Sequence, residues 1–330
     1  MSTAAESVKR VCLVGTGFIG LGWAVVFSRA GIEVRAYDRD PEQLDKLRSR
    51  LAQAFGLLER TGWLQSNAGQ RSLDHVTYHN SLPDALDEAE YVQESVPERL
   101  DSKRGAFEEI DRLVAPSVVI GSSSSAIPIS DIASETRHPE RCLVVHPTNP
   151  PHIVPLVEIV PGRRTADSAS DMVRDLMIRV GQSPVLCRRE VPGFILNRLQ
   201  FALEREAFCL AREGVASVAD IDRTVSDGLG LRWALMGPFL VEETNATSIR
   251  DDLEKFGVTI QDLFESVCQP LAPLNDRDIE RAERGVRELM DGRSHDDLLA
   301  FRDVGVMKIR GVKASLQNRA GDDLPRRQTQ

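Results

Sequence analysis

The sequence has no long apolar run and no excess of basic residues. Its longest apolar stretches, such as Val118–Ile120 and Leu143–Val145, fall far short of the ~20 residues that a membrane-spanning helix needs. Lys and Arg number 41 against 50 Asp and Glu, so the formal net charge is -9. Binding to nucleic acid would require basic clusters, so we expect neither a membrane segment nor a nucleic-acid partner.

Cysteines are few and scattered, without a C-x-x-C pair. The five are Cys12, Cys142, Cys187, Cys209 and Cys268. The polar segment Met1–Arg10 lacks the regions of a secretory signal, so we expect reduced thiols in a soluble, cytoplasmic protein. The histidines form no cluster with carboxylates at ligand spacing, and we expect no metal site.

Short apolar, β-branched runs alternate with longer amphipathic stretches from Arg10 to about Cys187. This alternation is typical of a parallel sheet with helices on both faces. The expected strands are Val11–Val14, Glu33–Tyr37, Tyr91–Glu94, Val118–Gly121, Leu143–His146, Val154–Val160 and Pro184–Cys187.

After Val191 the pattern becomes helical, as in Gly193–Glu213, where apolar residues recur on one side. A chain of 330 residues is long enough for two domains. We therefore expect a Rossmann-type doubly wound α/β domain over residues 1–190. An all-helical C-terminal domain is expected over residues 191–330.

A dinucleotide-binding signature follows the first expected strand. It reads Gly15-Thr16-Gly17-Phe18-Ile19-Gly20 and leads into an amphipathic stretch. Gly15 permits a tight turn, Gly17 lets a pyrophosphate approach the backbone, and Gly20 lets the helix pack closely on the sheet. The helix N-terminus then offers free N–H groups to the phosphates, so Gly15, Gly17 and Gly20, with Phe18 and Ile19, are candidate cofactor contacts.

Asp38 ends the second expected strand, 18 residues after Gly20. A carboxylate there accepts hydrogen bonds from the adenosine ribose and repels a 2′-phosphate, which favours NAD over NADP. Arg39 keeps the alternative open, because an arginine at this place can assist NADP. The predicted cofactor is NAD.

Two polar features lie at strand ends, at the edge of the sheet where such folds bind ligands. The four serines from Ser122 to Ser125 follow one strand, and His146 ends another. Glu158 lies twelve residues later inside an apolar run, where a carboxylate is costly unless it is paired. A His146–Glu158 pair suits alcohol oxidation, since the histidine can take the hydroxyl proton while the carboxylate stabilises the imidazolium.

Three segments together resemble the 3-hydroxyacyl-CoA dehydrogenase superfamily. They are His146–Pro151, Leu156–Glu158 and Pro192–Arg198, and the resemblance runs from about Val11 to at least Pro238.

The resemblance implies that His146 is the general base and that Glu158 is its partner. It implies that Ser125 and Asn197 hydrogen-bond the substrate oxygen. Ser125 is assigned by its distance before His146, and Ser124 is the alternative.

Two further residues enter the candidate cofactor site through the resemblance. Glu98 corresponds to a family glutamate near the nicotinamide. Lys103 matches a position that contacts CoA in members that use CoA, and the other interpretation is a solvated lysine in a charge-rich helix. His152, close to the catalytic loop, is expected to be exposed.

The segments His146–Pro151, Pro155–Glu158 and Gly228–Trp233, with Gly237-Pro238, resemble within the superfamily most of all the λ-crystallin group, which has L-gulonate 3-dehydrogenase activity. The hydroxyacyl-CoA enzymes carry two aromatic residues after the histidine, where this chain has Pro147 and Thr148. We therefore expect a small free 3-hydroxy acid as substrate. Arg232, predicted to lie in a glycine-punctuated loop, is the candidate partner of its carboxylate, or else a structural arginine.

Alternatives remain open for the substrate and for the role of the protein. Carnitine would require an aromatic cage, for which Trp233 and Phe239 are the nearby residues. A 3-hydroxyacyl-CoA is a second alternative, and a non-catalytic, crystallin-like NAD-binding protein is a third. The resemblance and the amphipathic helices together predict a homodimer.

Overall fold

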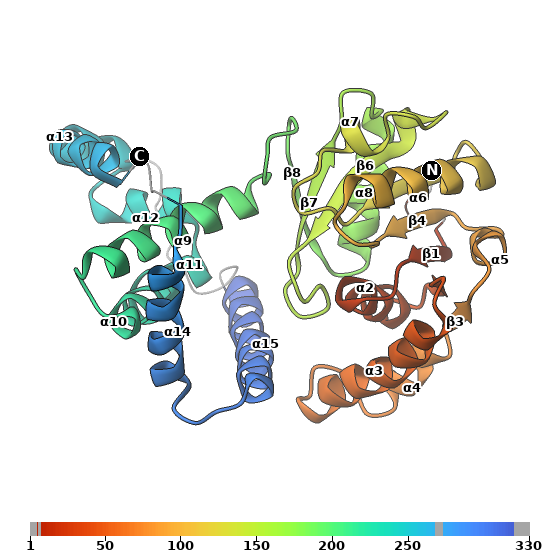
Figure 1. The fold of residues 1–330 in the computed structure, drawn as a ribbon, viewed down its shortest axis with the longest axis horizontal. Helices are drawn as coiled ribbons and strands as arrows, with labels where there is room; N and C mark the ends of the chain where they lie inside the picture. The colour runs from red at the N-terminus through yellow and green to blue at the C-terminus, as the bar shows by residue number, and fades with distance from the viewer. Residues whose placement is uncertain (1–4, 6–7, 268–272, 320–330) are drawn as a thin grey trace. The chain divides into compact units, whose positions relative to one another are not determined.

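The computed structural model describes residue 5, residues 8–267 and residues 273–319 (Figure 1). The chain divides into two compact units, Met1–Arg198 and Leu199–Gln330, which we describe separately. No helix in the described ranges is long and apolar enough to cross a membrane.

The first unit is built on an eight-stranded sheet in the order β3-β2-β1-β4-β5-β6-β7-β8. Neighbouring strands are parallel except for β6 and β7, which are antiparallel. The Rossmann-type prediction is confirmed. The strands are β1 (Arg10–Val14), β2 (Glu33–Tyr37), β3 (Val76–His79), β4 (Tyr91–Glu94), β5 (Val119–Ser122), β6 (Cys142–Pro147), β7 (Leu156–Pro161) and β8 (Ser183–Leu186).

Helices cover both faces of this sheet. One buried cluster joins α5, α6 and α7 to strand residues such as Val14 and Ile120. On the opposite face the ring of Phe27 from α2 lies 6.1 Å from that of Tyr91. The helical elements are α2 (Phe18–Arg29), α3 (Pro41–Arg60), α4 (Ala68–Leu73), α5 (Leu82–Leu86), α6 (Leu100–Leu113), α7 (Ile129–Ile132), the 3₁₀ turn η1 (Pro139–Arg141) and α8 (Asp167–Arg179).

The described part of the second unit is helical, as predicted. An ion pair of 2.6 Å between Arg212 of α9 and Asp278 of α14 holds two of its helices together. The elements are α9 (Leu196–Glu213), which begins in the first unit, α10 (Val218–Arg223), the π-helical η2 (Thr224–Leu229), α11 (Gly230–Leu235), α12 (Pro238–Asn245), α13 (Ile249–Val267), α14 (Asp276–Met290) and α15 (His295–Arg319).

Four of the five cysteines lie in the described ranges, and all four are unpaired. Cys12, Cys142 and Cys187 are buried, whereas Cys209 is partly exposed. Cys268 lies outside the described residues.

Candidate active site

The glycine loop after β1 is built from two glycines that the fold requires and one that borders open space. Gly15 has a φ of +97°, and a Cβ there would lie 2.7 Å from the Ser95 carbonyl oxygen. A Cβ on Gly20 would lie 2.1 Å from the carbonyl oxygen of Gly15, so the turn cannot carry a larger residue. A Cβ on Gly17 would meet no atom within 4 Å. This open space beside the N-terminus of α2 fits the approach of a dinucleotide phosphate.

Asp38 follows β2 and is held by the glycine loop itself. The backbone N–H and the hydroxyl of Thr16 donate to Asp38 Oδ2 at 3.1 and 2.9 Å. The N–H of Asp40 donates to Oδ1 at 3.1 Å. Thr16 was not among the predicted site residues, although its place between Gly15 and Gly17 puts its side chain next to the end of β2.

The other loop positions differ in exposure. Phe18 is 69% exposed, and the guanidinium of Arg50 lies 5.1 Å from its ring centre. Ile19 is half-buried and Arg39 is exposed. The first turn of α2 therefore presents a large aromatic surface next to the glycine loop.

His146 and Glu158 are directly opposite each other in the antiparallel pair β6–β7. His146 Nδ1 lies 2.8 Å from Glu158 Oε2, and both side chains are buried. Glu158 Oε1 accepts hydrogen bonds from the N–H groups of Ile195 and Leu196 at 2.8 and 2.9 Å. Burial alone would raise the pKa of Glu158, but hydrogen bonds from His146 and these two N–H groups hold it below its ordinary value.

An ionised Glu158 can only accept hydrogen bonds, so the proton of this pair lies on His146 Nδ1. In the neutral ring, Nε2 is then the basic nitrogen, and it has no hydrogen-bond partner among the described residues. The ring of Phe194 packs 5.7 Å from the imidazole. Burial, followed by the charge of Glu158, raises the pKa of the adjacent Cys187 thiol to about 11, so this thiol is not a nucleophile at neutral pH.

The four serines after β5 have different environments. Ser122, Ser123 and Ser124 are buried, and their hydroxyls are engaged by protein partners. Ser125 is exposed, and its hydroxyl has no hydrogen-bond partner in the described part of the chain. Of the two candidates, Ser125 and Ser124, only Ser125 presents a free hydroxyl.

Asn197 joins the serine loop to the His146–Glu158 pair. Its Nδ2 donates to the carbonyl oxygen of Ser125 at 2.9 Å, and the two residues before it bind Glu158. One short segment, Ile195–Asn197, thus contacts both Glu158 and Ser125.

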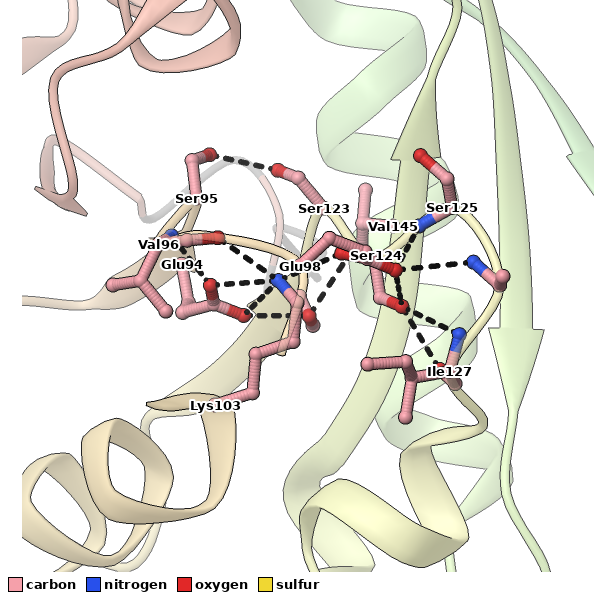
Figure 2. A network of polar contacts seen from close by, with 12 residues as sticks. Glu94, Ser95, Val96, Glu98, Lys103, Ser123, Ser124, Ser125, Ile127 and Val145 are labelled. Carbon is pink, nitrogen blue, oxygen red and sulfur yellow. Dashed lines mark hydrogen bonds and ion pairs between the residues drawn. The ribbon is translucent and has the colours of Figure 1, made fainter. Parts of the chain in front are cut away.

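Glu98, which is 40% exposed, and the buried Lys103 belong to one polar network, which Figure 2 shows from close by. Glu98 Oε1 accepts from the Ser124 hydroxyl at 2.7 Å and from the N–H groups of Ser125 and Ala126 at 2.9 and 3.2 Å. Burial would raise the pKa of Glu98, but the Ser124 hydrogen bond and the Lys103 charge lower it below its ordinary value.

Lys103 is only 1% exposed, so the interpretation as a solvated lysine is wrong. Its Nζ is buried because Glu94 and Glu98 supply counter-charges at 2.9 and 3.3 Å. Glu94 was not among the predicted site residues, although a carboxylate at the end of a buried strand is a signal that could have identified it. Burial raises the pKa of Glu94 above its ordinary value, although the charge of Lys103 acts against this.

Two other sequence expectations are corrected. Arg232 lies in helix α11 of the second unit and not in a loop, and its side chain is exposed. His152 is buried, because its loop packs against α2, where Arg29 donates to the His152 carbonyl oxygen at 3.1 Å. Among the residues that the structure describes, no group of three or more His, Cys, Asp or Glu side chains could hold a metal ion.

Comparison with known proteins identifies the family. Residues 10–191 match the NAD binding domain of 3-hydroxyacyl-CoA dehydrogenase, and residues 193–255 match the C-terminal domain of that family.

Similar proteins cover nearly the whole chain. It is 41% identical over 313 residues to an L-carnitine dehydrogenase of Streptomyces griseus, covering 93% of this chain and 90% of that one. It is 37% identical over 322 residues to a lambda-crystallin homolog of Bos taurus, covering 96% and 99%.

Among solved structures, a 5-formyl-3-hydroxy-2-methylpyridine 4-carboxylic acid 5-dehydrogenase, described as an NAD-dependent dismutase, is similar with a TM-score of 0.78. Its sequence is 28% identical, and the match covers 94% of this chain and 99% of that chain. The chain belongs to the 3-hydroxyacyl-CoA dehydrogenase family and is an NAD-dependent oxidoreductase.

Proposed function

We propose that the protein oxidises the 3-hydroxyl group of a small free hydroxy acid, with His146 as the general base. The observation that carries this proposal is the buried 2.8 Å contact between His146 and Glu158, which leaves Nε2 as the basic nitrogen. The same arrangement serves the reverse reaction, in which the imidazolium returns the proton.

The residues around the glycine loop fit NAD. Gly15, Gly17 and Gly20, with the N–H groups of Phe18 and Ile19, would hold the pyrophosphate at the start of α2. Asp38 would accept the ribose hydroxyls, and Glu98 would lie near the nicotinamide. The buried Lys103 ammonium would act through Glu98. When bound, NAD supplies the acceptor for the hydride that leaves the substrate carbon.

The chain's own residues handle the proton and the substrate oxygen. Ser125 and Asn197 hydrogen-bond that oxygen, and His146 Nε2 takes its proton as the C–O bond becomes a carbonyl. Glu158, fixed by two backbone N–H groups, then faces a doubly protonated imidazole and stabilises its charge.

A free acid is favoured over an acyl-CoA by the residues after His146. Pro147 and Thr148 occupy the two positions after the histidine at which the hydroxyacyl-CoA enzymes of the superfamily carry aromatic residues. We propose an L-gulonate-like substrate on the resemblance to the λ-crystallin group stated above. We propose that Arg232 binds the carboxylate of that acid.

L-Carnitine is the second candidate, and it is also a free 3-hydroxy acid. The 41% identity to an L-carnitine dehydrogenase supports it. Trp233 and Phe239, both exposed, are the aromatic residues that we propose for its quaternary ammonium.

We also propose that the second unit forms a homodimer with another copy of this chain. Helix α13 carries an apolar stripe on one side, and most of it is exposed. The stripe consists of Leu253, Phe256, Ile260, Leu263, Phe264 and Val267. An exposed apolar face of this length needs a partner surface, and a second copy offers the same face.

A substrate panel tests the proposed function. NADH formation is followed with L-gulonate, L-carnitine and 3-hydroxybutyryl-CoA, using His146→Gln as the inactive control. Turnover of a free acid but not of the CoA thioester is the expected result. Turnover of the thioester alone overturns the free-acid proposal, and NAD binding without turnover of any compound favours the non-catalytic role.

A further inference from the structure

Glu94, at the end of β4, is a buried carboxylate that takes no part in the steps above. Its exposed fraction is 0%. Oε1 accepts from Lys103 Nζ at 2.9 Å and from the N–H of Val96 at 2.6 Å, and Oε2 accepts from the Ser122 hydroxyl at 2.6 Å and from Lys103 at 3.2 Å (Figure 2). Four donated hydrogen bonds from three partners converge on one side chain: Lys103 lies in α6, Ser122 ends β5, and Val96 lies in the turn after β4.

Lys103 extends from α6 and connects this buried carboxylate to a more exposed one. Besides Glu94, its Nζ contacts the Val96 carbonyl oxygen and Glu98 Oε2, each at 3.3 Å. A buried ammonium is strongly held by whichever carboxylates surround it, because an unpaired buried charge is costly. The position of the Lys103 ammonium is therefore set mainly by Glu94, the closer and fully buried partner.

The second carboxylate, Glu98, shares its two oxygens between this ammonium and the serine loop. Lys103 holds Oε2, while Oε1 accepts three hydrogen bonds from Ser124, Ser125 and Ala126. The orientation that satisfies Lys103 also aims the other oxygen at the loop. One of the three donors is the backbone N–H of Ser125 itself.

We propose that Glu94 is a positioning residue, which holds Lys103 and through it Glu98, and so fixes the Ser124–Ala126 loop that presents Ser125 to the substrate. The functional part rests on the proposed role of Ser125. The structural part, that the loop is fixed from Glu94, is independent of any substrate.

A second buried ion pair on the same helix provides a matched control. Asp111, near the other end of α6, contacts Arg141 at 2.6 Å, and both side chains are almost fully buried. Its further partner is the backbone N–H of Arg137, and none of its hydrogen bonds reaches the serine loop. Asp111→Asn should therefore lower stability without disturbing Ser125.

Hydrogen–deuterium exchange of the free protein tests the structural part. In Glu94→Gln, the amides of Ser125 and Ala126 should exchange about 10-fold faster, because their acceptor is no longer held in place. Asp111→Asn should leave these amides unchanged. Unchanged exchange in Glu94→Gln, or equal acceleration in both variants, overturns the proposal.

Kinetics test the functional part with the free acid that turns over in the panel. Glu94→Gln should lower kcat by about 10- to 100-fold, as misplacement of a contact to the reacting group does. The dissociation constant of NAD should rise less than kcat falls, because the network reaches the proposed cofactor site only at Lys103 and Glu98, while the glycine loop and Asp38 lie outside it. Loss of NAD affinity in parallel with kcat indicates general damage and overturns the positioning role.

A double-mutant cycle separates an effect through Lys103 from a direct one. If Glu94 acts through Lys103, Glu94→Gln with Lys103→Met lowers kcat no further than Lys103→Met alone. If the kcat losses of the two single variants multiply in the double variant, the proposal is contradicted.

Glu94→Asp covers the case in which Glu94→Gln does not fold. It keeps the charge but withdraws the carboxylate from Lys103 Nζ, and it should accelerate the same two amides to a smaller extent. No acceleration overturns the proposal. If no free acid turns over, the proposed function fails, while the exchange measurement still decides whether Glu94 fixes the loop.

Discussion

The two units differ in what they do with their apolar side chains. The first unit buries large residues such as Trp23, Phe27 and Phe107 between the sheet and its helices. In the described part of the second unit, Val241 and Met307 are the only buried hydrophobic residues. The first unit can therefore close its own core, whereas the second consists of amphipathic helices that need another surface to cover them.

This contrast separates two tasks along the chain. The predicted base, its carboxylate partner, the serine and the asparagine all lie in the first unit, on a sheet with a closed core. Precise catalytic geometry is best held by such a rigid support. The second unit instead offers association surface and, by our proposal, a cation for the substrate.

Glu158→Gln is expected to have the largest effect, and it tests whether the first unit carries the chemistry. A glutamine cannot stabilise the imidazolium and can favour the wrong tautomer, so kcat should fall about 100-fold or more. NADH formation with the active free acid measures it. Glu190→Gln, which alters a carboxylate that binds Ser130 in the same unit, should keep nearly normal kcat. Wild-type activity in Glu158→Gln would contradict the assignment.

The second prediction concerns the stripe on α13. Replacing Phe256 and Phe264 by Glu places charges in the proposed dimer contact and should raise the dimer dissociation constant about 100-fold. Sedimentation velocity measures the change. Val258→Glu, an equally polar substitution on the opposite side of α13, is the control and should leave the dimer intact. A monomeric wild-type protein would refute the dimer.

The third prediction concerns the cation that we assign to the second unit. Arg232→Met should raise KM for free hydroxy acids about 10-fold, since a charge-assisted hydrogen bond to the carboxylate is lost. Arg223→Met removes another exposed arginine of the same unit and should leave KM unchanged. An unchanged KM in Arg232→Met removes Arg232 from the site and leaves all assigned chemistry in the first unit.

The smallest effect is a pH dependence of the first unit's stability. The pKa of Glu158 is held below its ordinary value of 4.5, so the folded state binds this proton less readily than the unfolded chain does. Its stabilisation is present above about pH 4.5 and is lost as the pH falls through the folded-state pKa. The melting temperature should therefore fall less steeply below pH 4.5 in Glu158→Gln than in the wild type. An equal fall of the melting temperature below pH 4.5 in both proteins would contradict the lowered pKa of Glu158.

The sheet and the His146–Glu158 pair could be predicted from the sequence because both leave local signals. Strands buried on both faces read as apolar runs, and a carboxylate inside such a run requires a partner. Strand β3 was missed since it is a short edge strand, whose residues Thr77 and His79 interrupt any apolar pattern.

The surroundings of Lys103 and Arg232 could not be predicted in the same way. Lys103 is buried by carboxylates from β4 and the turn after it, and helix periodicity does not reveal such partners. The glycines before Arg232 suggested a loop, yet Gly230 sits inside continuous helix, where a Cβ would lie 2.8 Å from the Val225 carbonyl oxygen. A glycine is needed at position 230 because successive helical turns pack closely there, and it does not mark a break in the helix.

The most direct test of the central claim is the rate of hydride transfer to NAD in His146→Gln, measured in a single turnover beside NAD affinity. We expect the rate with the active free acid to fall at least about 100-fold, the contribution typical of a general base, with NAD affinity unchanged. A rate equal to that of the wild type would show that the buried pair on β6 and β7 does not carry the chemistry.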